Sequence, residues 1–321
     1  AVQVPILLYH RIDYSETDTR TAGMGGMEPM YGYVTLDGNA AASGTARAFS
    51  GITRQFEFEA FSMNNIESIE VNKTLTADMP ADAPAGTINL RTRSALDLKR
   101  PRGSFSAGFI WNSIENGFRR TPRVDDSVHA KTRPRFSFDY SSGPLLGGKL
   151  GLTVNGAFTN IFKEQFTSTI TYDYTSAAAR AAGTPLITNL NFKDGPKLTE
   201  KSSGGLKVDY QVQPGLRLTG ALSYCYFNDF WGNRNVQFIT TAANLQPGSS
   251  PTRIIARNSN NANTRIDQTG SPNGKVMDTI NASYAMNWRR GPWLADLTLV
   301  YSRVRETRGS LAYGMIGATP V

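Results

Sequence analysis

"GLKVDYQVQPGLRLTGALSYCYF", residues 205–227, contains two runs in which apolar residues occupy every second position. Those positions are Leu206, Val208, Tyr210 and Val212 in the first run, and Leu216, Leu218, Leu222, Tyr224 and Tyr226 in the second. Successive side chains of an extended strand point to opposite faces, so each run predicts a β-strand with one apolar and one polar face. The "QPG" between the runs is typical of a short turn, because Pro and Gly favour turn conformations.

The same alternation recurs along the chain from residue 103 onward. Further strands are expected near residues 105–111, 136–140, 150–158, 280–288 and 297–301. Together with the two runs above, the pattern predicts about seven strands, most of them about 9 to 14 residues long. Helical periodicity is almost absent between them, so the fold is expected to be mainly β.

The connections between these strands alternate in length. Short turns rich in Gly and Pro ("SSGPLLGGK", "QPG" and "RRGP") alternate with long polar segments at roughly 112–133, 164–203 and 229–275. An outer-membrane β-barrel has short turns on one side of the membrane and long loops on the other. The alternation therefore favours such a barrel over a soluble β-sandwich, which has no reason to keep this order.

Aromatic residues near the expected strand ends point to the same architecture. Trp288 and Trp293 flank the "RRGP" turn, and Trp111 and Tyr140 lie near the ends of other strands. Aromatic girdles at both membrane interfaces are typical of transmembrane barrels. The alternative is a large antiparallel sandwich with these aromatic residues in its core.

If the strands span a membrane, their polar faces are expected to line a wet interior. The polar positions are Lys207, Asp209 and Gln211, and also Asp296, Thr298 and Ser302. Seven strands would leave an open edge with unpaired amides in hydrocarbon, which lipid does not tolerate. We therefore expect an antiparallel transmembrane β-barrel that is incomplete in this chain, which ends on "MIGATPV" without a strand pattern.

The composition is compatible with this fold but does not select it. The 321 residues include 34 Lys and Arg against 26 Asp and Glu, a net charge of +8. This excess suits a nucleic-acid surface, contact with anionic lipid, or basic loops. The single cysteine, Cys225, excludes an intrachain disulfide. No apolar stretch approaches the roughly 18 residues of a membrane-spanning helix, and the first residues lack the pattern of a signal peptide.

Three phrases in the first third of the chain indicate a family. They are "YGYVTLDGN" (Tyr31–Asn39), "NNIESIEVNK" (Asn64–Lys73) and "APAGTINLRTR" (Ala83–Arg93). In this order, within about Asp18 to Leu96, they resemble the plug domain of TonB-dependent outer-membrane receptors. The resemblance identifies the plug motif as Asp37, Gly38, Glu70, Gly86 and Asn89, with a tight turn at Asp37 and Gly38.

The resemblance also implies the domain organisation. Residues 1–98 are expected to form a small mixed α/β plug domain whose N-terminal part is missing. Residues 103–321 are expected to form a β-barrel domain whose C-terminal part is missing. The chain would then hold about seven strands of a barrel with about 22.

The implied function is transport across the bacterial cell outer membrane. Such a receptor binds a scarce ligand of the siderophore, cobalamin, haem or oligosaccharide type, and a TonB-type inner-membrane energising complex moves the plug. Outer-membrane lipid and lipopolysaccharide are the other expected partners. No catalytic residue, metal, cofactor or nucleic acid is expected, so the protein is not expected to be an enzyme. A passive porin or structural outer-membrane barrel is the alternative.

Two further patterns suggest binding of phosphate groups. "GPLLGGKL" matches most of a nucleotide-binding P-loop, but Leu150 replaces the required Ser or Thr and a strand follows in place of a helix. A hairpin turn is the simpler interpretation. A basic cluster could contact nucleic acid or lipopolysaccharide phosphates, although most such runs are merely solvated. Its members are Arg119, Arg120, Arg123, Lys131, Arg133 and Arg135.

The second alternative function rests on "VPILLYHRID", Val4–Asp13, which resembles the first strand of polysaccharide deacetylases. It would make the chain a metal-dependent carbohydrate esterase. That chemistry requires a metal held by several His or Asp ligands. Asp125, Asp126 and His129 are present, but no apolar strand precedes them and no second histidine follows. The terminal stretch is therefore interpreted as part of the plug or as unrelated sequence.

Overall fold

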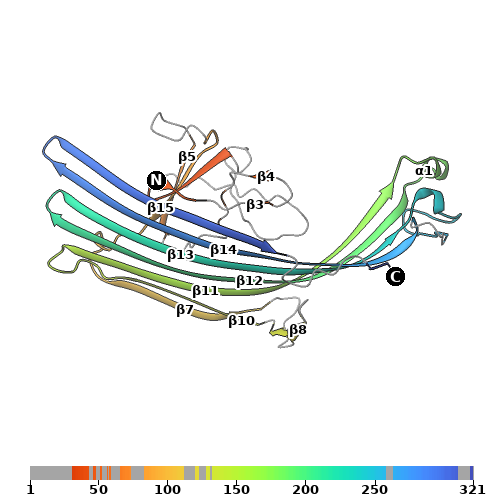
Figure 1. Cartoon of the computed structure of the whole chain (residues 1–321), viewed down its shortest axis with the longest axis horizontal. Helices are drawn as coiled ribbons and strands as arrows, with labels where there is room; N and C mark the ends of the chain where they lie inside the picture. The colour runs from red at the N-terminus through yellow and green to blue at the C-terminus, as the bar shows by residue number, and fades with distance from the viewer. Residues whose placement is uncertain are drawn as a thin grey trace.

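The computed structural model shows a mainly β protein built from one small and one large sheet (Figure 1). It describes residues 31–42, 46–47, 51–52, 56, 58, 66–73, 83–111, 120–122, 128–130, 132–257, 263–309 and 319–320. Val4–Asp13, the stretch that resembles polysaccharide deacetylases, lies outside these ranges, and so do Asp125 and Asp126.

The small sheet has four strands in the order β2-β1-β6-β5. They are β1 (Gly32–Leu36), β2 (Asn39–Ala40), β5 (Ile66–Asn72) and β6 (Gly86–Thr92). β1 runs parallel to β6, and the other two pairs are antiparallel. The sheet is therefore mixed, with β6 at its centre.

A compact apolar cluster and one tight turn shape the small sheet. Val34, Ile88 and Leu90 are buried together with Phe56 and Ala85. β1 and β2 are joined at Asp37 and Gly38, whose φ angles are 49° and 82°. Two consecutive positive φ angles are the requirement of a type I′ hairpin turn, and Asp-Gly is one of its preferred sequences.

The large sheet is an antiparallel series in which each strand pairs with the next along the path β7-β10-β11-β12-β13-β14-β15. Its strands are β7 (Arg102–Ile110), β10 (Arg133–Ser141), β11 (Leu150–Asp173), β12 (Leu186–Gln213), β13 (Leu216–Ile239), β14 (Arg265–Arg290) and β15 (Trp293–Gly309). The seven strands predicted from the sequence are confirmed in their order. Figure 1 shows them as one strongly curved sheet.

Short strands complete the described part. β3 (Ala46–Arg47) pairs with β4 (Gly51–Ile52), β8 (Arg120–Pro122) pairs with β9 (Val128–Ala130), and β16 (Thr319–Pro320) pairs with β14.

Five of the seven strands, β11 to β15, are longer than the sequence pattern predicted, whereas β7 and β10 have nine residues each. The segments 164–203 and 229–275 were expected to be long polar loops, and this is wrong for most of their length. β11 and β12 stay paired from Leu150 opposite Tyr210 to Asp173 opposite Leu186. Toward the tip both faces carry polar side chains, so the ladder forms without the apolar–polar contrast from which a strand is recognised.

Only the tips of these long strands leave the ladder. Helix α1 (Ala177–Ala182) joins β11 to β12, and its first turn is capped by Ser176 Oγ, which accepts from the Ala179 N–H at 3.1 Å. The short 3-10 helix η3 (Ala242–Asn244) follows β13.

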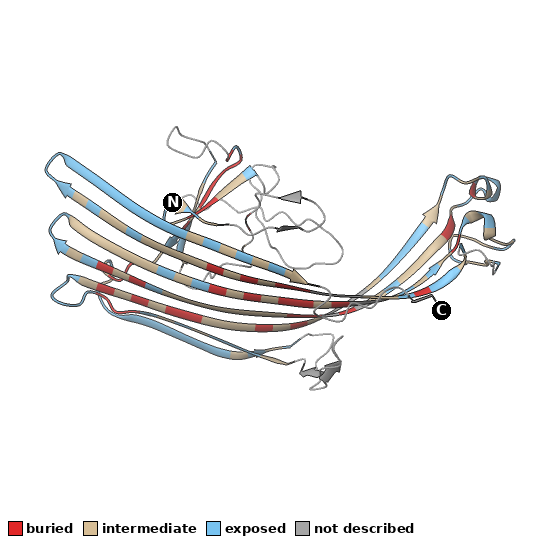
Figure 2. Ribbon diagram, in the orientation of Figure 1, coloured by how far each residue is buried: buried red, intermediate tan, exposed pale blue. Residues whose placement is uncertain are grey.

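The two faces of the large sheet differ sharply in chemistry. The outward face carries exposed apolar side chains such as Phe105, Leu222 and Leu299, which are 73%, 51% and 59% exposed. The inward face, on the side of the small sheet, buries polar and charged side chains, including Lys207 and Asp209. Figure 2 shows buried positions alternating with more exposed ones along the central strands. This is the reverse of a soluble protein, in which apolar side chains are buried and charged ones exposed.

Candidate functional site

The small sheet lies against the inward face of the large sheet, and polar contacts join the two (Figure 1). Most of these contacts gather where β6 ends and the chain continues toward β7. At another point the Ala42 N–H donates to Ser302 Oγ on β15 at 3.0 Å. The main group of contacts is called the inter-sheet network. Its residues are Asp37, Thr92, Ser94, Lys207, Asp209 and Arg217.

Asp37 and Thr92 connect the β1–β2 turn with the large sheet. Asp37 Oδ1 accepts from the Thr92 N–H at 2.8 Å, and Asp37 Oδ2 accepts from Thr92 Oγ1 at 2.5 Å. Lys207 Nζ on β12 donates to the same Thr92 Oγ1 at 2.7 Å and lies 3.6 Å from Asp37 Oδ2. Because Lys207 is buried, its charge requires such a partner. The Thr92 hydroxyl therefore bridges the two sheets as both donor and acceptor.

Asn89 extends this chain of hydrogen bonds across the small sheet. Its Oδ1 accepts from the Gly38 N–H at 2.8 Å and from Thr35 Oγ1 at 2.9 Å. Its Nδ2 donates to Glu70 Oε2 on β5 at 2.9 Å, and Arg91 Nη1 donates to Glu70 Oε1 at 2.8 Å. One side chain thus ties the turn, β1 and β5 to the central strand.

Asp209 anchors the connection between β6 and β7. Its carboxylate is 1% exposed and accepts from Ser94 Oγ at 2.9 Å, from Arg217 Nη2 at 3.0 Å and from Thr219 Oγ1 at 2.8 Å. Arg217 also donates to Ser94 Oγ and lies 3.4 Å from Asp97 Oδ1. A buried carboxylate with one cation and two hydroxyl donors is well satisfied, and removing it would leave these donors without their acceptor.

Two glycines permit close approach of neighbouring backbone. Gly86 begins β6 with a φ of +111°, and a Cβ at this position would lie 2.2 Å from the Asn72 carbonyl oxygen. Gly151 on β11 faces the connection after β6, where a Cβ would lie 2.8 Å from the Leu96 nitrogen. Only glycine fits both places without movement of the neighbouring backbone.

The residues of the expected plug motif fall in two places. Asn89 hydrogen-bonds both Gly38 and Glu70, and Asp37, the neighbour of Gly38 in the chain, accepts from Thr92. Gly86 lies at the opposite end of β6 and contributes its backbone conformation alone.

Two expectations about the polar face of the large sheet need correction. Lys207 and Asp209 were expected to line a wet interior, but they are 7% and 1% exposed. Lys207 contacts the small sheet, and Asp209 contacts the connection that follows β6. Sequence reasoning did not single out Thr92, Ser94 or Arg217. For Arg217, the available signal was its position in the polar phase of β13, since a polar face needs partners when another element covers it.

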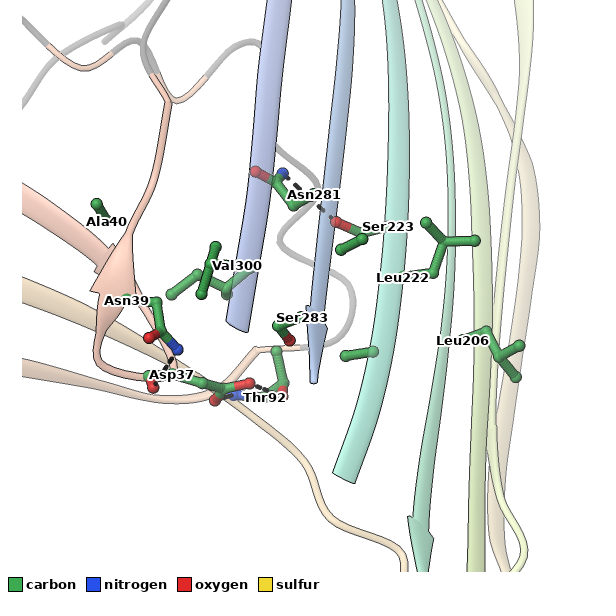
Figure 3. Close-up of a pocket in the computed structure, with 13 residues that line it drawn as sticks. Asp37, Asn39, Ala40, Thr92, Leu206, Leu222, Ser223, Asn281, Ser283 and Val300 are labelled. Carbon is green, nitrogen blue, oxygen red and sulfur yellow. Dashed lines mark hydrogen bonds between the residues drawn. The ribbon is translucent and has the colours of Figure 1, made fainter. Parts of the chain in front are cut away.

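A small pocket lies beside the inter-sheet network, between the β1–β2 hairpin and strands β12 to β15 (Figure 3). Its volume of about 40 Å³ is enough for about three water molecules. Figure 3 shows Asp37 and Thr92 on one side, and Ser223, Asn281 and Ser283 on the other. The small sheet therefore meets this part of the large sheet across a small gap whose lining is mostly apolar, with a few polar side chains.

The P-loop-like sequence forms a turn, as its simpler interpretation predicted. Residues 142–149 connect β10 to β11, with positive φ at Gly143, Gly147 and Gly148. A strand follows this turn, so the helix N-terminus that a nucleotide phosphate requires is not there.

Within the described ranges, no group of three or more His, Cys, Asp or Glu side chains could hold a metal ion. Arg119, Arg123 and Lys131 of the basic cluster lie outside the described residues, whereas Arg133 and Arg135 belong to β10. None of the helices in the described ranges is long and apolar enough to cross a membrane.

The small sheet is expected to lose stability in acid through Glu70. Its hydrogen bond from Asn89, and then that from Arg91, hold the pKa of Glu70 below the ordinary 4.5. A lowered folded-state pKa contributes stability that is present above the ordinary pKa and lost as pH falls through the folded value. The difference in urea midpoint between the wild type and Glu70→Gln should therefore shrink between about pH 6 and about pH 3. A spin label at Ser68→Cys on exposed β5 reports the midpoint, and a difference independent of pH would contradict this role.

Comparisons with known proteins find similarity among solved structures alone. No protein-family model and no curated protein matches the chain. The siderophore receptor PirA from Pseudomonas aeruginosa is 12% identical, with a TM-score of 0.28 over 88% of this chain and 50% of that one. PirA from Acinetobacter baumannii is 11% identical, with a TM-score of 0.29 over 92% and 50%. The siderophore receptor PiuA from Acinetobacter baumannii is 10% identical, with a TM-score of 0.27 over 94% and 55%. The chain spans about half the length of these proteins.

Proposed function

We propose that the chain is part of a bacterial outer-membrane receptor that takes up a scarce ligand by TonB-energised active transport. The observation that carries the proposal is the apolar outward face of the large sheet. Over one band of each long strand, the outward positions of the described residues include no charged side chain. Lipid provides the apolar surroundings that such an exposed face requires, whereas water does not.

The height of this apolar band supports a membrane position. The band runs from Leu216 to Tyr226 on β13, from Ile280 to Trp288 on β14, and from Trp293 to Tyr301 on β15. Each run has about 9 to 11 residues, the length of a transmembrane strand. With a rise of about 3.3 Å per residue and a tilt of about 40°, nine residues cover about 23 Å, close to the apolar height of an outer-membrane barrel.

The small sheet has the position that a plug would take. Residues 1–98 would form the plug domain and residues 103–321 the barrel domain. Asp37, Gly38, Glu70, Gly86 and Asn89 would hold the plug together, and the inter-sheet network would hold it against the wall. The plug would act as a gate that buried ion pairs and hydrogen bonds keep closed. Opening it would require a partner that shifts the equilibrium toward the open state. A TonB-type inner-membrane complex would supply that work.

The ligand would be of the siderophore, cobalamin, haem or oligosaccharide type, bound and released without covalent chemistry. Outer-membrane lipid and lipopolysaccharide would contact the outward face. A passive porin or structural barrel would share the apolar band. It has no need of the contact between Lys207 and Asp37, which joins β12 to the small sheet. Nor does it need the hydrogen bonds of Ser94 with Asp209 and Arg217, which join the connection after β6 to β12 and β13.

Fractionation and uptake test this function in the protein expressed from its complete reading frame. We expect a heat-modifiable band in the outer membrane and TonB-dependent uptake of one labelled ligand from the four types. A disulfide between Ala42→Cys and Ser302→Cys, which replace residues in contact, should stop uptake without preventing binding. A reductant should restore uptake. Uptake without TonB would indicate a passive channel, and a soluble protein would exclude both barrels.

Replacing Leu222 by arginine distinguishes lipid from water around the outward face. Leu222 lies in the middle of the band on β13 and is 51% exposed. In water the change should alter the free energy of unfolding by about 0.5 kcal/mol at most. At the midplane of a bilayer it should cost about 2–4 kcal/mol. Urea unfolding in lipid vesicles, followed by tryptophan fluorescence, measures the difference.

The matched control is Asn228→Arg. This outward position lies two residues beyond the end of the band on the same strand, where we expect a cost of about 1 kcal/mol or less. Equally small costs at Leu222 and Asn228 would argue for a water-exposed sheet.

A further inference from the structure

Two arginines stand at one edge of the apolar band on the outward face of β15. Arg303 and Arg305 are exposed and follow Tyr301, the last apolar outward residue of this strand. Residues two apart on a strand share one face, about 7 Å from each other along the strand. The pair therefore presents two guanidinium groups side by side just beyond the apolar surface.

Neither guanidinium is engaged by the described part of the chain. Arg303 lies opposite Ile280 on β14, which offers no polar side chain. Arg305 lies opposite Asp278, but Asp278 Oδ1 accepts a hydrogen bond of 2.7 Å from the Tyr224 hydroxyl. Within the described ranges, no hydrogen bond or ion pair holds Arg303 or Arg305. Their charges are thus available to a partner.

Arg303 and Arg305 lie at the edge of the apolar band that is farther from the short turns. The opposite edge of the band carries Trp288 and Trp293 next to the turn between β14 and β15. In the proposed receptor, short turns face the periplasm and the long strand extensions face outward. This inference rests on that proposed function, which places Arg303 and Arg305 at the level of the polar head groups of the outer leaflet.

We propose that Arg303 and Arg305 bind the phosphate groups of lipid A, the phosphorylated glycolipid anchor of lipopolysaccharide. A guanidinium matches phosphate oxygens with two parallel hydrogen bonds, which makes arginine well suited to phosphate recognition. The long apolar stems of both side chains can lie along the lipid surface while their charged ends reach the head group. The site would fix a lipid A molecule beside Tyr301.

Binding to purified lipid A tests the assignment. The protein from its complete reading frame is purified in detergent, and native mass spectrometry measures its binding to bisphosphorylated and to dephosphorylated lipid A. The double variant Arg303→Gln with Arg305→Gln should lose at least about tenfold in affinity for bisphosphorylated lipid A. Dephosphorylated lipid A should bind the wild type and the variant equally weakly. Arg290→Gln, which removes one positive charge at the opposite edge of the band, should bind like the wild type.

Three outcomes would overturn the proposal. They are unchanged affinity in the double variant, equal loss in Arg290→Gln, and displacement of lipid A by millimolar inorganic phosphate, which would indicate a site for free phosphate. Heat-modifiable mobility, measured on the same samples, separates this result from the proposed function. A folded barrel with unchanged lipid A affinity rejects the lipid site alone, whereas a protein that does not enter the membrane rejects the receptor itself.

Discussion

Replacing Gly86 by alanine is expected to destabilise the small sheet by about 3 kcal/mol or more. The φ angle of +111° is strained for any residue with a side chain, and the new Cβ would lie 2.2 Å from the Asn72 carbonyl oxygen. Since that oxygen belongs to backbone, β5 must move away from β6. We expect a large drop in the urea midpoint reported by the spin label at Ser68→Cys.

Gly38→Ala is the matched control for this effect. Gly38 also has a positive φ, +82°, but a Cβ there would meet no atom within 4 Å. The substitution therefore carries the conformational cost alone, about 1–2 kcal/mol. If both variants lowered the midpoint equally, contact with Asn72 would not be the reason for glycine at position 86.

Replacing Asp209 by alanine should detach the small sheet from the large one. Three groups donate to this buried carboxylate, and Arg217 would keep its charge after losing its closest carboxylate partner. Breaking a buried ion pair from one side costs about 3–5 kcal/mol. Hydrogen exchange should show faster exchange of the amides of β6 and of the following connection, while exchange in β13 and β14 stays slow.

Asp296→Ala provides the comparison on the same inward face. Asp296 is exposed near the start of β15 and accepts from Asn287 Nδ2 at 2.8 Å, away from the small sheet. An exposed site of this kind should change the free energy of unfolding by about 0.5 kcal/mol at most. If hydrogen exchange in β6 stayed as slow in Asp209→Ala as in Asp296→Ala, contacts other than those of Asp209 would hold the small sheet against the large one.

The strands of the large sheet were predictable because their two faces differ. Leu206, Val208 and Tyr210 alternate with Lys207 and Asp209, and this contrast marks both the strand and its faces. The alternation fades where β11 and β12 continue toward their tips, so the sequence underestimated strand length there. The backbone ladder needs no apolar face once both faces meet water.

The candidate site was less predictable, because its contacts join distant parts of the chain. The Asp37–Gly38 turn is a local property of two residues, and the sequence indicates it directly. By contrast, Thr92 and Lys207 are 115 residues apart and share no local pattern. Their hydrogen bond depends on how the small sheet packs against the large one, and the residue pattern of neither segment indicates that packing.

The parallel pairing of β1 and β6 has a mechanical consequence. Their register runs from Gly32 opposite Gly86 to Leu36 opposite Leu90, and β6 is anchored at its last residue, Thr92, and just beyond it at Ser94. A force applied to the chain ahead of β1 would pull the two strands in opposite directions along their length. All their hydrogen bonds would then bear the load together in shear, whereas peeling would break them one at a time. We therefore expect a pulling force to break the contacts with β12 and β13 before the strands of the small sheet separate from one another.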